Sequence, residues 1–291
     1  LNTQVNKRIR VGTIINMVKK NITEPRSTNS DIVLLVYQGA PNFTPFLPDG
    51  SGRVARYAYA GEGHNRSPET DLHPGNYQHS NSHAINAQGY IDVNIIKGLV
   101  WQVKGGLNYN GDTYKSHQQV VSQYAFIKPP GADDFPYVDD GGKSGGVTDR
   151  YSQNLLPSLY STLTYDKTFG KYHTLKVLGG YEQQSFKTQF LQGSRLSFPT
   201  ATLAEINAGS PVGQSLSGTS TEWALRSYFG RVNYDFMGKY LLEANIRYDG
   251  SSRIAEENRW GAFPSVSAGW RISKENFIQN NVSWIDDLKL R

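Results

Sequence analysis

Residues Ser227 to Arg291 read SYFGRVNYDFMGKYLLEANIRYDGSSRIAEENRWGAFPSVSAGWRISKENFIQNNVSWIDDLKLR. From Tyr240 to Tyr248, the even positions carry Tyr, Leu, Ala, Ile and Tyr, whereas the odd positions carry Leu, Glu, Asn and Arg. One face of such a strand suits hydrocarbon and the other mostly suits water. A period of two over this length, with aromatic residues at the strand ends, is typical of a transmembrane β-barrel wall.

The same two-faced pattern recurs upstream, where Ile85, Ile91 and Val93 alternate with polar residues such as Asn86 and Asp92. A charge on the lipid face near the membrane centre costs about 2–4 kcal/mol, so this sorting of side chains is an energetic requirement. The alternation predicts an all-β, antiparallel sheet of about eight strands, at roughly 4–20, 80–94, 99–115, 151–166, 171–192, 221–236, 239–252 and 259–272.

The connections between these strands alternate in length. The short ones are 94–98, 166–170 and 237–238, whereas the long ones are 21–79, 116–150, 193–220 and 253–258. Outer-membrane barrels have short periplasmic turns and long extracellular loops, so the long connections are expected outside the cell. The segment after the last strand, 273–288, lacks alternation and is expected to be a periplasmic connection.

Composition is consistent with a barrel wall and excludes other classes. The hydrophobic fraction is 37% and the mean hydropathy is −0.53, which suits a wall in which only alternate residues are apolar. No apolar run approaches the length of about 18 residues that a transmembrane helix needs. The net charge of +5 comes from scattered Lys and Arg residues, so no nucleic-acid partner is expected.

Aromatic residues cluster beside the short turns. Amphipathic rings favour the level of the lipid headgroups, so these residues are expected to form the periplasmic aromatic girdle, in contact with outer-membrane lipid. The predicted girdle consists of Trp101, Tyr165, Tyr172, Tyr234, Phe236, Tyr240 and Trp270.

Several motifs resemble the SusC/RagA family of TonB-linked outer-membrane transporters. They are SYFGRVNYDF, KYLLEANIRYDGSSR, RWGAFPSVSAGWRIS, the closing DLKLR, and the upstream hairpins NIIKGLVWQVKGGLNYN and LTYDKTFGKYHTLKVLGGYE. The resemblance covers roughly residues 80–291. It implies that residues 1–291 are part of a barrel of about 22 strands, without its plug domain and the remainder of its wall. The sheet is therefore expected to be curved, open and incomplete.

The resemblance also implies a function. Members take up glycans or peptides across the outer membrane of Gram-negative, Bacteroidota-like cells, driven by the TonB complex through an N-terminal region and assisted by a SusD-like surface lipoprotein. Within RYDGSSR, the residues Arg247, Asp249 and Arg253 are candidates for contact with the lumen or the plug.

Other chemistry is not strongly indicated. Four histidines, His64, His73, His79 and His83, and a loop with Asp133, Asp134, Asp139 and Asp140 leave transition-metal and calcium binding open. No hydrolase elbow or zinc-protease motif is present, so neither enzymatic activity nor a cofactor is expected.

Two alternative functions stay open at this point. A passive pore or an adhesin would use the same kind of barrel without a plug or TonB dependence. A soluble carbohydrate-binding β-sandwich would have two opposed sheets and no aromatic girdle.

Overall fold

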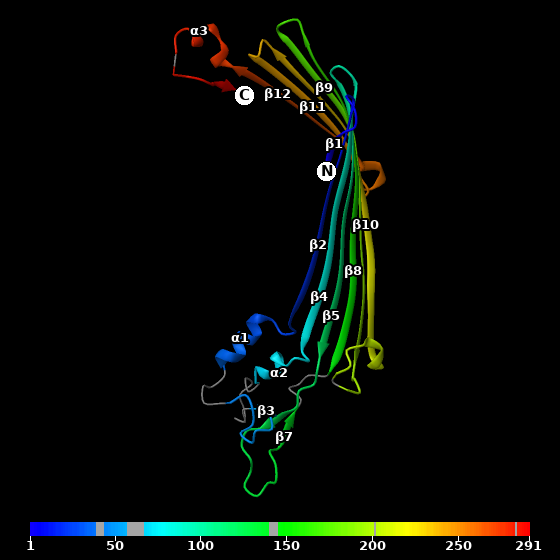
Figure 1. Ribbon diagram of the computed structural model, residues 1–291, viewed down its shortest axis with the longest axis vertical. Coiled ribbons are helices and arrows are strands. Elements are labelled where there is room, and N and C mark those ends of the chain that lie inside the picture. The colour runs from blue at the N-terminus through cyan, green and yellow to red at the C-terminus, as the bar shows by residue number, and fades with distance from the viewer. Residues whose placement is uncertain (39–43, 57–66, 140–144, 201, 283) are drawn as a thin grey trace.

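The computed structural model describes residues 1–38, 44–56, 67–139, 145–200, 202–282 and 284–291. Its main feature is a single curved sheet of ten strands in the order β1-β2-β4-β5-β8-β9-β10-β11-β12-β13, with every neighbouring pair antiparallel. The two edge strands, β1 and β13, do not pair, and Figure 1 shows the sheet as a bent, open wall. The predicted all-β, antiparallel and incomplete barrel wall is confirmed.

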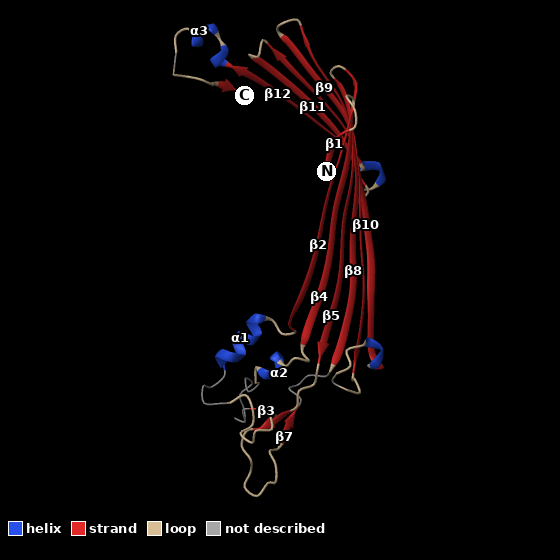
Figure 2. Ribbon diagram, viewed as in Figure 1, coloured by secondary structure: helices blue, strands red, loops and turns tan. Residues whose placement is uncertain are grey.

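The main sheet contains eight long strands and two short ones at its edges. Their bounds are β1 Asn2–Gln4, β2 Ile9–Pro25, β4 Tyr77–Ile96, β5 Leu99–Gln118, β8 Gly146–Phe169, β9 His173–Leu196, β10 Ser210–Phe236, β11 Tyr240–Ser251, β12 Trp260–Arg271 and β13 Lys289–Leu290. A second sheet consists of β3 Val54–Arg56, β6 Gln123–Ala125 and β7 Tyr137–Asp139. The helical segments, shown with the strands in Figure 2, are α1 Asn29–Gln38, α2 Glu69–Leu72, η1 Ile206–Ala208, η2 Glu256–Asn258, η3 Ile272–Lys274 and α3 Asn276–Gln279.

Short turns join the strands at one end of the wall, called here the short-turn end, and the opposite end is the long-loop end. Gly98 makes the β4–β5 turn with φ of +87°, and a Cβ at this residue would lie 2.4 Å from the carbonyl oxygen of Asp166. Only glycine combines this backbone conformation with such a close approach.

The first predicted strand, 4–20, was wrong at both ends. The side chain of Asn6 accepts hydrogen bonds from the backbone N–H groups of Arg8 and Ile9, at 2.8 and 2.9 Å. This Asx turn reverses the chain, so that Gln4 on β1 pairs back with Arg10 on β2.

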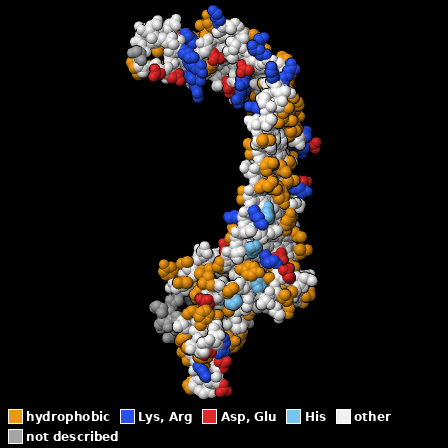
Figure 3. Space-filling view, viewed as in Figure 1, with side chains coloured by type: hydrophobic (Ala, Val, Ile, Leu, Met, Phe, Trp, Pro, Cys, Tyr) orange, Lys and Arg blue, Asp and Glu red, His pale blue; other side chains and the backbone are white. Residues whose placement is uncertain are grey.

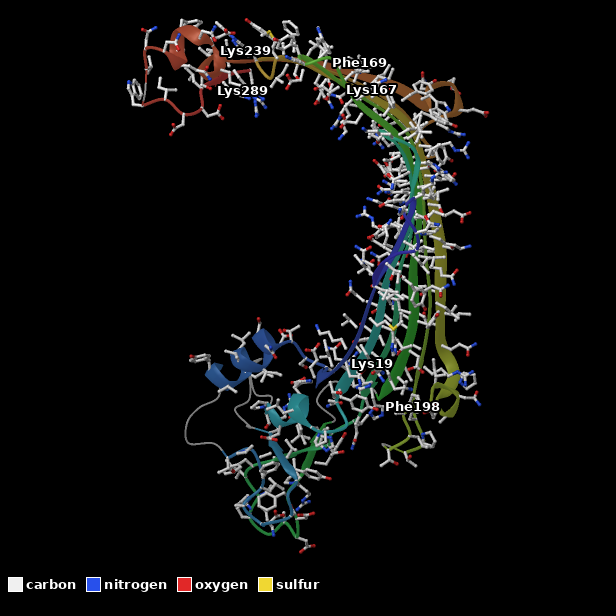
Figure 4. The ribbon with its side chains drawn as sticks, turned by 45° about the horizontal axis from the view of Figure 1, so that its top comes forward. Lys19, Lys167, Phe169, Phe198, Lys239 and Lys289 are labelled. Atoms are coloured by element: carbon white, nitrogen blue, oxygen red, sulfur yellow. The ribbon has the colours of Figure 1, made fainter. Side chains whose placement is uncertain are left out.

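The wall has two faces of different composition. Apolar side chains such as Ile15, Leu242, Ile246 and Val266 are exposed on the outer face, with Val266 at 74% exposure. Figure 3 shows hydrophobic side chains along the length of the wall, and Figure 4 shows side chains projecting from both sides of a single layer. Because the main sheet is one layer thick throughout the described ranges, the β-sandwich alternative is wrong.

The strands differ greatly in length at the long-loop end. β10 has 27 residues and β8 and β9 have 24 each, whereas β11 and β12 have only 12. The predicted loops 116–150 and 193–220 were too long, because β8 begins at Gly146, β9 continues to Leu196 and β10 begins at Ser210.

The described residues of the β2–β4 and β5–β8 loops form a small unit at the long-loop end. Arg53 beside β3 forms ion pairs with Asp49 at 2.6 Å and with Asp134 at 2.7 Å, and its guanidinium lies 4.7 Å from the ring centre of Tyr124. These contacts join the β2–β4 loop to the β5–β8 loop. Hydrogen bonds from Ser51 and then Arg53 lower the pKa of Asp49 to about 2, and hydrogen bonds from Arg53 and the backbone N–H of Phe135 lower the pKa of Asp134 to about 2.

Helices contribute little to the architecture. α1 and α2 lie in the β2–β4 connection, and α3 follows β12 in the region expected to be a periplasmic connection. Of the helices in the described ranges, none has the length and hydropathy that crossing a membrane requires.

Candidate functional site

Two neighbouring rows of side chains cross the lumen face of the wall from β2 to β11. Strand register aligns the first row, which contains Arg10, Asp92, Gln102, Thr162, Gly180, Phe229 and Arg247. The second row lies two residues closer to the long-loop end and contains Gly12, Tyr90, Lys104, Tyr160, Glu182, Ser227 and Asp249. These two rows are called the lumen belt below.

Arg247 is the centre of one half of the lumen belt. Its Nε donates to Oδ1 of Asp249 at 2.7 Å, and its Nη2 donates to Oε2 of Glu182 and Oγ of Ser227, both at 2.8 Å. The same guanidinium lies 5.6 Å from the ring centre of Phe229. The planar fork of donors on arginine suits such a shared set of acceptors, so three strands are held together at one point.

Asp92 is the centre of the other half. Its side chain accepts hydrogen bonds from Nε of Arg10 at 2.9 Å, from Nη2 of Arg10 at 2.5 Å and from Nε2 of Gln102 at 2.5 Å. The residue is only 5% exposed although the wall is one layer thick. These charge-assisted bonds tie β2, β4 and β5 together on the lumen side.

Aromatic rings fill the space between the two charged centres. The ring of Phe229 covers Gly180, where a Cβ would lie 2.2 Å from the ring, and it stacks on Tyr160 with 5.5 Å between ring centres. Nζ of Lys104 lies 5.8 Å from the ring centre of Tyr160. A glycine is needed at position 180 because the neighbouring ring occupies the space of its side chain.

The lumen belt borders a depression of about 430 Å³ on the lumen face. Its lining includes charged, amide and aromatic groups from β2, β4, β5 and β8, namely Arg10, Gln88, Tyr90, Asp92, Lys104 and Tyr160. This surface can receive another polar surface or a polar ligand through hydrogen bonds and ring contacts.

Arg253 lies apart from Arg247 and Asp249. It follows β11 and places its guanidinium 4.5 Å from the ring centre of Trp223 on β10. Trp223 in turn stacks on Phe186 of β9, with 5.5 Å between ring centres. The structure thus brings Arg247 and Asp249 together, and gives Arg253 a separate aromatic stack nearer the long-loop end.

A second depression, of about 650 Å³, lies on the lumen face closer to the long-loop end. Hydroxyl groups dominate its lining, together with two guanidinium groups and one carboxylate, and its residues include Arg26, Ser80, Ser82, Asp112, Tyr114, Ser116, Thr148, Arg150 and Ser152. This site was missed from the sequence because its members come from four strands and one loop, and the serines carry no distinctive spacing.

Six of the seven residues expected in the periplasmic girdle lie on the outer face near the short-turn end, and Tyr172 lies in the β8–β9 turn itself. Cross-strand pairing aligns Phe236, Tyr240 and Trp270. Nε1 of Trp101 donates to Oγ of Ser161 at 3.0 Å, and Tyr234 is hydrogen-bonded to His173 at 2.6 Å. Tyr165 pairs with Leu99.

Glu275 joins this aromatic group to the segment after β12. Its Oε1 accepts from the Tyr240 hydroxyl at 2.8 Å and from Nε1 of Trp270 at 3.1 Å, and its Oε2 lies 2.9 Å from Nζ of Lys239. The hydrogen bonds from Lys239, Trp270 and Tyr240 lower the pKa of Glu275 to about 2. Nothing in the sequence pattern indicated this role, because Glu275 lies outside the alternating segments.

A second aromatic group lies on the outer face at the far end of the apolar band. The ring of Trp260 stacks on Tyr248 at 5.0 Å and on Tyr228 at 6.1 Å, and Tyr228 contacts Tyr181 at 5.3 Å between ring centres. The eight-residue spacing from Tyr240 to Tyr248 was a signal that could have predicted this group. About 27 Å of strand separates the two aromatic levels, which at a tilt of about 35–45° corresponds to about 19–22 Å of height, somewhat less than the roughly 25 Å of a barrel's apolar band.

Two of the residues that left metal binding open have other partners. His79 is hydrogen-bonded to Thr23 at 2.6 Å, and Asp134 is paired with Arg53. His64 and Asp140 lie outside the described residues. Within the described ranges, no group of three or more His, Asp or Glu side chains is arranged to hold a metal ion.

Comparisons with known proteins agree with this architecture. The family model described as TonB dependent receptor-like, beta-barrel matches residues 22–291. A TonB-dependent receptor of Formosa agariphila is 30% identical over 69% of this chain and 18% of its own length. The TonB-dependent receptor SusC of Bacteroides thetaiotaomicron is 36% identical over 52% of this chain and 14% of its own length.

Solved structures show the same fold. The chain matches the structure of the RagAB peptide transporter with a TM-score of 0.76 at 22% identity, covering 99% of this chain and 31% of the matched chain. The open-open state of the RagAB peptide importer gives a TM-score of 0.75 with 30% of that chain covered. The chain therefore spans less than a third of these solved chains and less than a fifth of the two curated relatives described.

A one-layer antiparallel wall with an apolar outer face and a polar lumen face defines a transmembrane β-barrel protein of the outer membrane. The match over residues 22–291 places the chain more narrowly. It belongs to the TonB-dependent receptor family, in the SusC/RagA group.

Proposed function

We propose that this chain forms part of the wall of a transporter that takes up glycans or peptides across the outer membrane, using energy from the TonB complex. A SusD-like surface lipoprotein would capture the substrate outside, and residues 1–291 would all belong to the barrel domain. The observation that carries the proposal is the lumen belt, which lines the lumen face with paired charges and rings across seven strands.

The lumen belt suits contact with a plug. A folded plug presents polar groups to the wall, and the lumen belt offers both carboxylates and guanidinium groups for hydrogen bonds. Arg247 and Asp249 already hold each other in position, so they form a preorganised surface for such contacts. Arg253 would act nearer the mouth, where its stack on Trp223 holds it beside the lumen.

The depression of about 650 Å³ supports a polar substrate. Its hydroxyl groups donate and accept hydrogen bonds, and Tyr114 adds an aromatic ring, as both glycans and peptides require. The name of one structural relative, the RagAB peptide transporter, refers to peptides, and this is consistent with one of the two substrate classes.

The two aromatic levels of the outer face support insertion into lipid. The group near Tyr240 would lie at the periplasmic headgroups, and the group near Trp260 would lie at the outer headgroups. With this orientation the long-loop end projects outside the cell. The role is transport, with no catalytic step assigned to any residue.

Uptake by living cells tests the proposal. A strain that lacks the gene for the full-length protein would be supplied with labelled oligosaccharides and labelled oligopeptides, with and without the restored gene, in backgrounds with and without TonB. Uptake that needs both the restored gene and TonB is the expected result. Uptake that continues without TonB would show a passive pore, and cell attachment without any uptake would show an adhesin.

A further inference from the structure

The part of β10 that extends beyond the end of β11, at the long-loop end, has a free edge. β10 pairs with β11 only from Leu225 to Phe236, whereas it pairs with β9 along nearly its whole length. The last backbone hydrogen bonds of β10 on the β11 side are at Ala224, whose N–H donates to Oγ of Ser252 at 2.8 Å and whose carbonyl accepts from the N–H of Ser252 at 2.9 Å. Beyond this point, no described strand lies beside β10 on that side.

The free edge of β10 lies in the interior of the sheet and not at either of its two ends. β10 and β11 are adjacent strands of the same wall, and further barrel strands would extend the wall at β1 or β13. Additional strands of the barrel therefore cannot occupy the space beside 215–224. The edge stays open in any barrel that contains this hairpin, unless a loop or another protein covers it.

The direction of the N–H and C=O groups at Ala224 shows which backbone groups of β10 face the open side. Ala224 directs its N–H and carbonyl toward β11, and backbone groups alternate between the two sides of a strand. The residues Leu216, Gly218, Ser220 and Glu222 therefore direct their backbone donors and acceptors to the open side. Four residues with correct spacing form a template for one additional strand.

This edge also lacks the usual protection against pairing. Natural edge strands carry lysine, proline or bulges that prevent the addition of another strand. Here Pro211 and the register shift after Ser210 are confined to the tip, and 215–224 reads SLSGTSTEWA with Glu222 as its single charge. Ser, Thr and Gly at most of these positions leave room on both faces for larger side chains of a partner strand.

A second copy of the protein does not fit this edge. Copies in one membrane share an orientation, so a two-fold axis would lie along the membrane normal. Barrel strands tilt by about 35–45°, and the two edges would then cross at about 70–90°. Neighbouring strands in a sheet differ by only about 20–25°.

We infer that 215–224 of β10 binds an extended, uncharged or basic segment of the surface lipoprotein, which adds a strand to the wall outside the membrane. This inference rests on the proposed function, since it takes the partner from there. The segment would form backbone hydrogen bonds with Leu216, Gly218, Ser220 and Glu222. Its lack of negative charge follows from the carboxylate of Glu222, whose side chain is 73% exposed and whose ion pair with Lys187, at 3.9 Å between exposed groups, is weak.

Proline substitution tests the inference in the full-length transporter with its separately purified lipoprotein. Ser220→Pro removes an N–H on the open side and leaves the β9 side unchanged, because edge strands tolerate proline there. We expect Ser220→Pro to weaken lipoprotein binding about tenfold or more, and Ser220→Ala to change it less than twofold. Equal binding by both variants and the wild type would overturn the inference.

Residue-resolved hydrogen exchange on the unsubstituted protein gives a second readout that does not depend on a variant. The amides of Leu216, Gly218, Ser220 and Glu222 should exchange rapidly in the transporter alone and become protected in the complex, whereas those of Ser217 and Thr219 should be protected in both. Protection of the open side before the lipoprotein is added would show that a loop of the same chain covers the edge. A lipoprotein that does not bind the wild type at all would overturn the proposed function itself.

Discussion

The guanidinium of Arg247 on β11 reaches across β10 to the carboxylate of Glu182 on β9, with 2.8 Å between Nη2 and Oε2. This contact links strands that are not adjacent in the sheet. The hydroxyl of Ser227 lies between them and accepts a bond from the same nitrogen, and it is almost fully buried. The wall is therefore fastened on its lumen side by side chains as well as by backbone ladders.

Replacement of Arg247 should weaken the wall. Arg247→Met leaves the carboxylates of Glu182 and Asp249 without their shared partner, and we expect the free energy of unfolding to fall by about 1–3 kcal/mol. Denaturant titration of the full-length barrel measures this loss. Lys176→Met is the matched control, because its ion pair with Asp166 spans 4.0 Å between exposed groups and should contribute less than about 1 kcal/mol. Equal losses in the two variants would contradict a special role for Arg247.

Two adjacent glycines on β9 offer a sharper comparison. Gly180→Ala places a Cβ 2.2 Å from the ring of Phe229, and we expect it to destabilise the barrel by about 1–3 kcal/mol. Gly179→Ala meets no atom within 4 Å and should be neutral or slightly stabilising. Thermal unfolding of the two variants measures the difference. Addition of Phe229→Ala to Gly180→Ala should recover part of the loss if the ring is the cause.

The contact of Glu275 with the aromatic residues should make stability depend on pH. The pKa of Glu275 is lowered from its ordinary value of 4.5 to about 2, so ionised Glu275 stabilises the folded state above pH 4.5. This stabilisation decreases as the pH falls below 4.5 and is lost as the pH passes through about 2. Melting temperatures of the wild type and Glu275→Gln should therefore differ at pH 7 and converge toward pH 2. Glu257→Gln, at an exposed position in η2, should behave like the wild type throughout.

The depth in lipid of four tryptophans, Trp101, Trp223, Trp260 and Trp270, tests the two aromatic levels. Single-tryptophan variants of the full-length protein would be placed in vesicles with bromine at known depths. Trp101 and Trp270 at one level and Trp260 at the other should be quenched most by bromine close to the headgroups. Trp223, which stacks between Arg253 and Phe186, should be quenched weakly at every depth. Strong quenching of Trp260 at the bilayer centre would remove the second level from the membrane interface.

The sequence predicted the wall wherever lipid imposes a pattern. The alternation from Tyr240 to Tyr248 identified β11 almost to its ends, because a charge facing hydrocarbon is costly. The start of β10 was missed, since 210–220 lies beyond the second aromatic level and its residues do not alternate between apolar and polar. β3, β6 and β7 were also missed, because their pairing depends on Arg53 and other contacts between distant loops.

The site was predictable only in part for the same reason. Arg247 and Asp249 could be singled out from one strand, where they stand two residues apart and share a face. Glu182 and Ser227 complete the set from two other strands, and only the register of β9, β10 and β11 brings them together. Arg253 is close in sequence to Arg247, yet it lies after the end of β11 and contacts Trp223, whereas Arg247 lies within β11 and contacts Glu182.

The unequal strands give the mouth of the wall a stepped rim. From a shared row at the short-turn end, β10 extends for 27 residues and its neighbour β11 for 12, so about 50 Å of additional strand rises on one side. The rim is therefore high along β8, β9 and β10 and low along β11 and β12. A molecule above β11 has the polar ends of the longer strands beside it, and among the described strands neither β11 nor β12 rises to enclose it, so it would approach and leave across these two short strands.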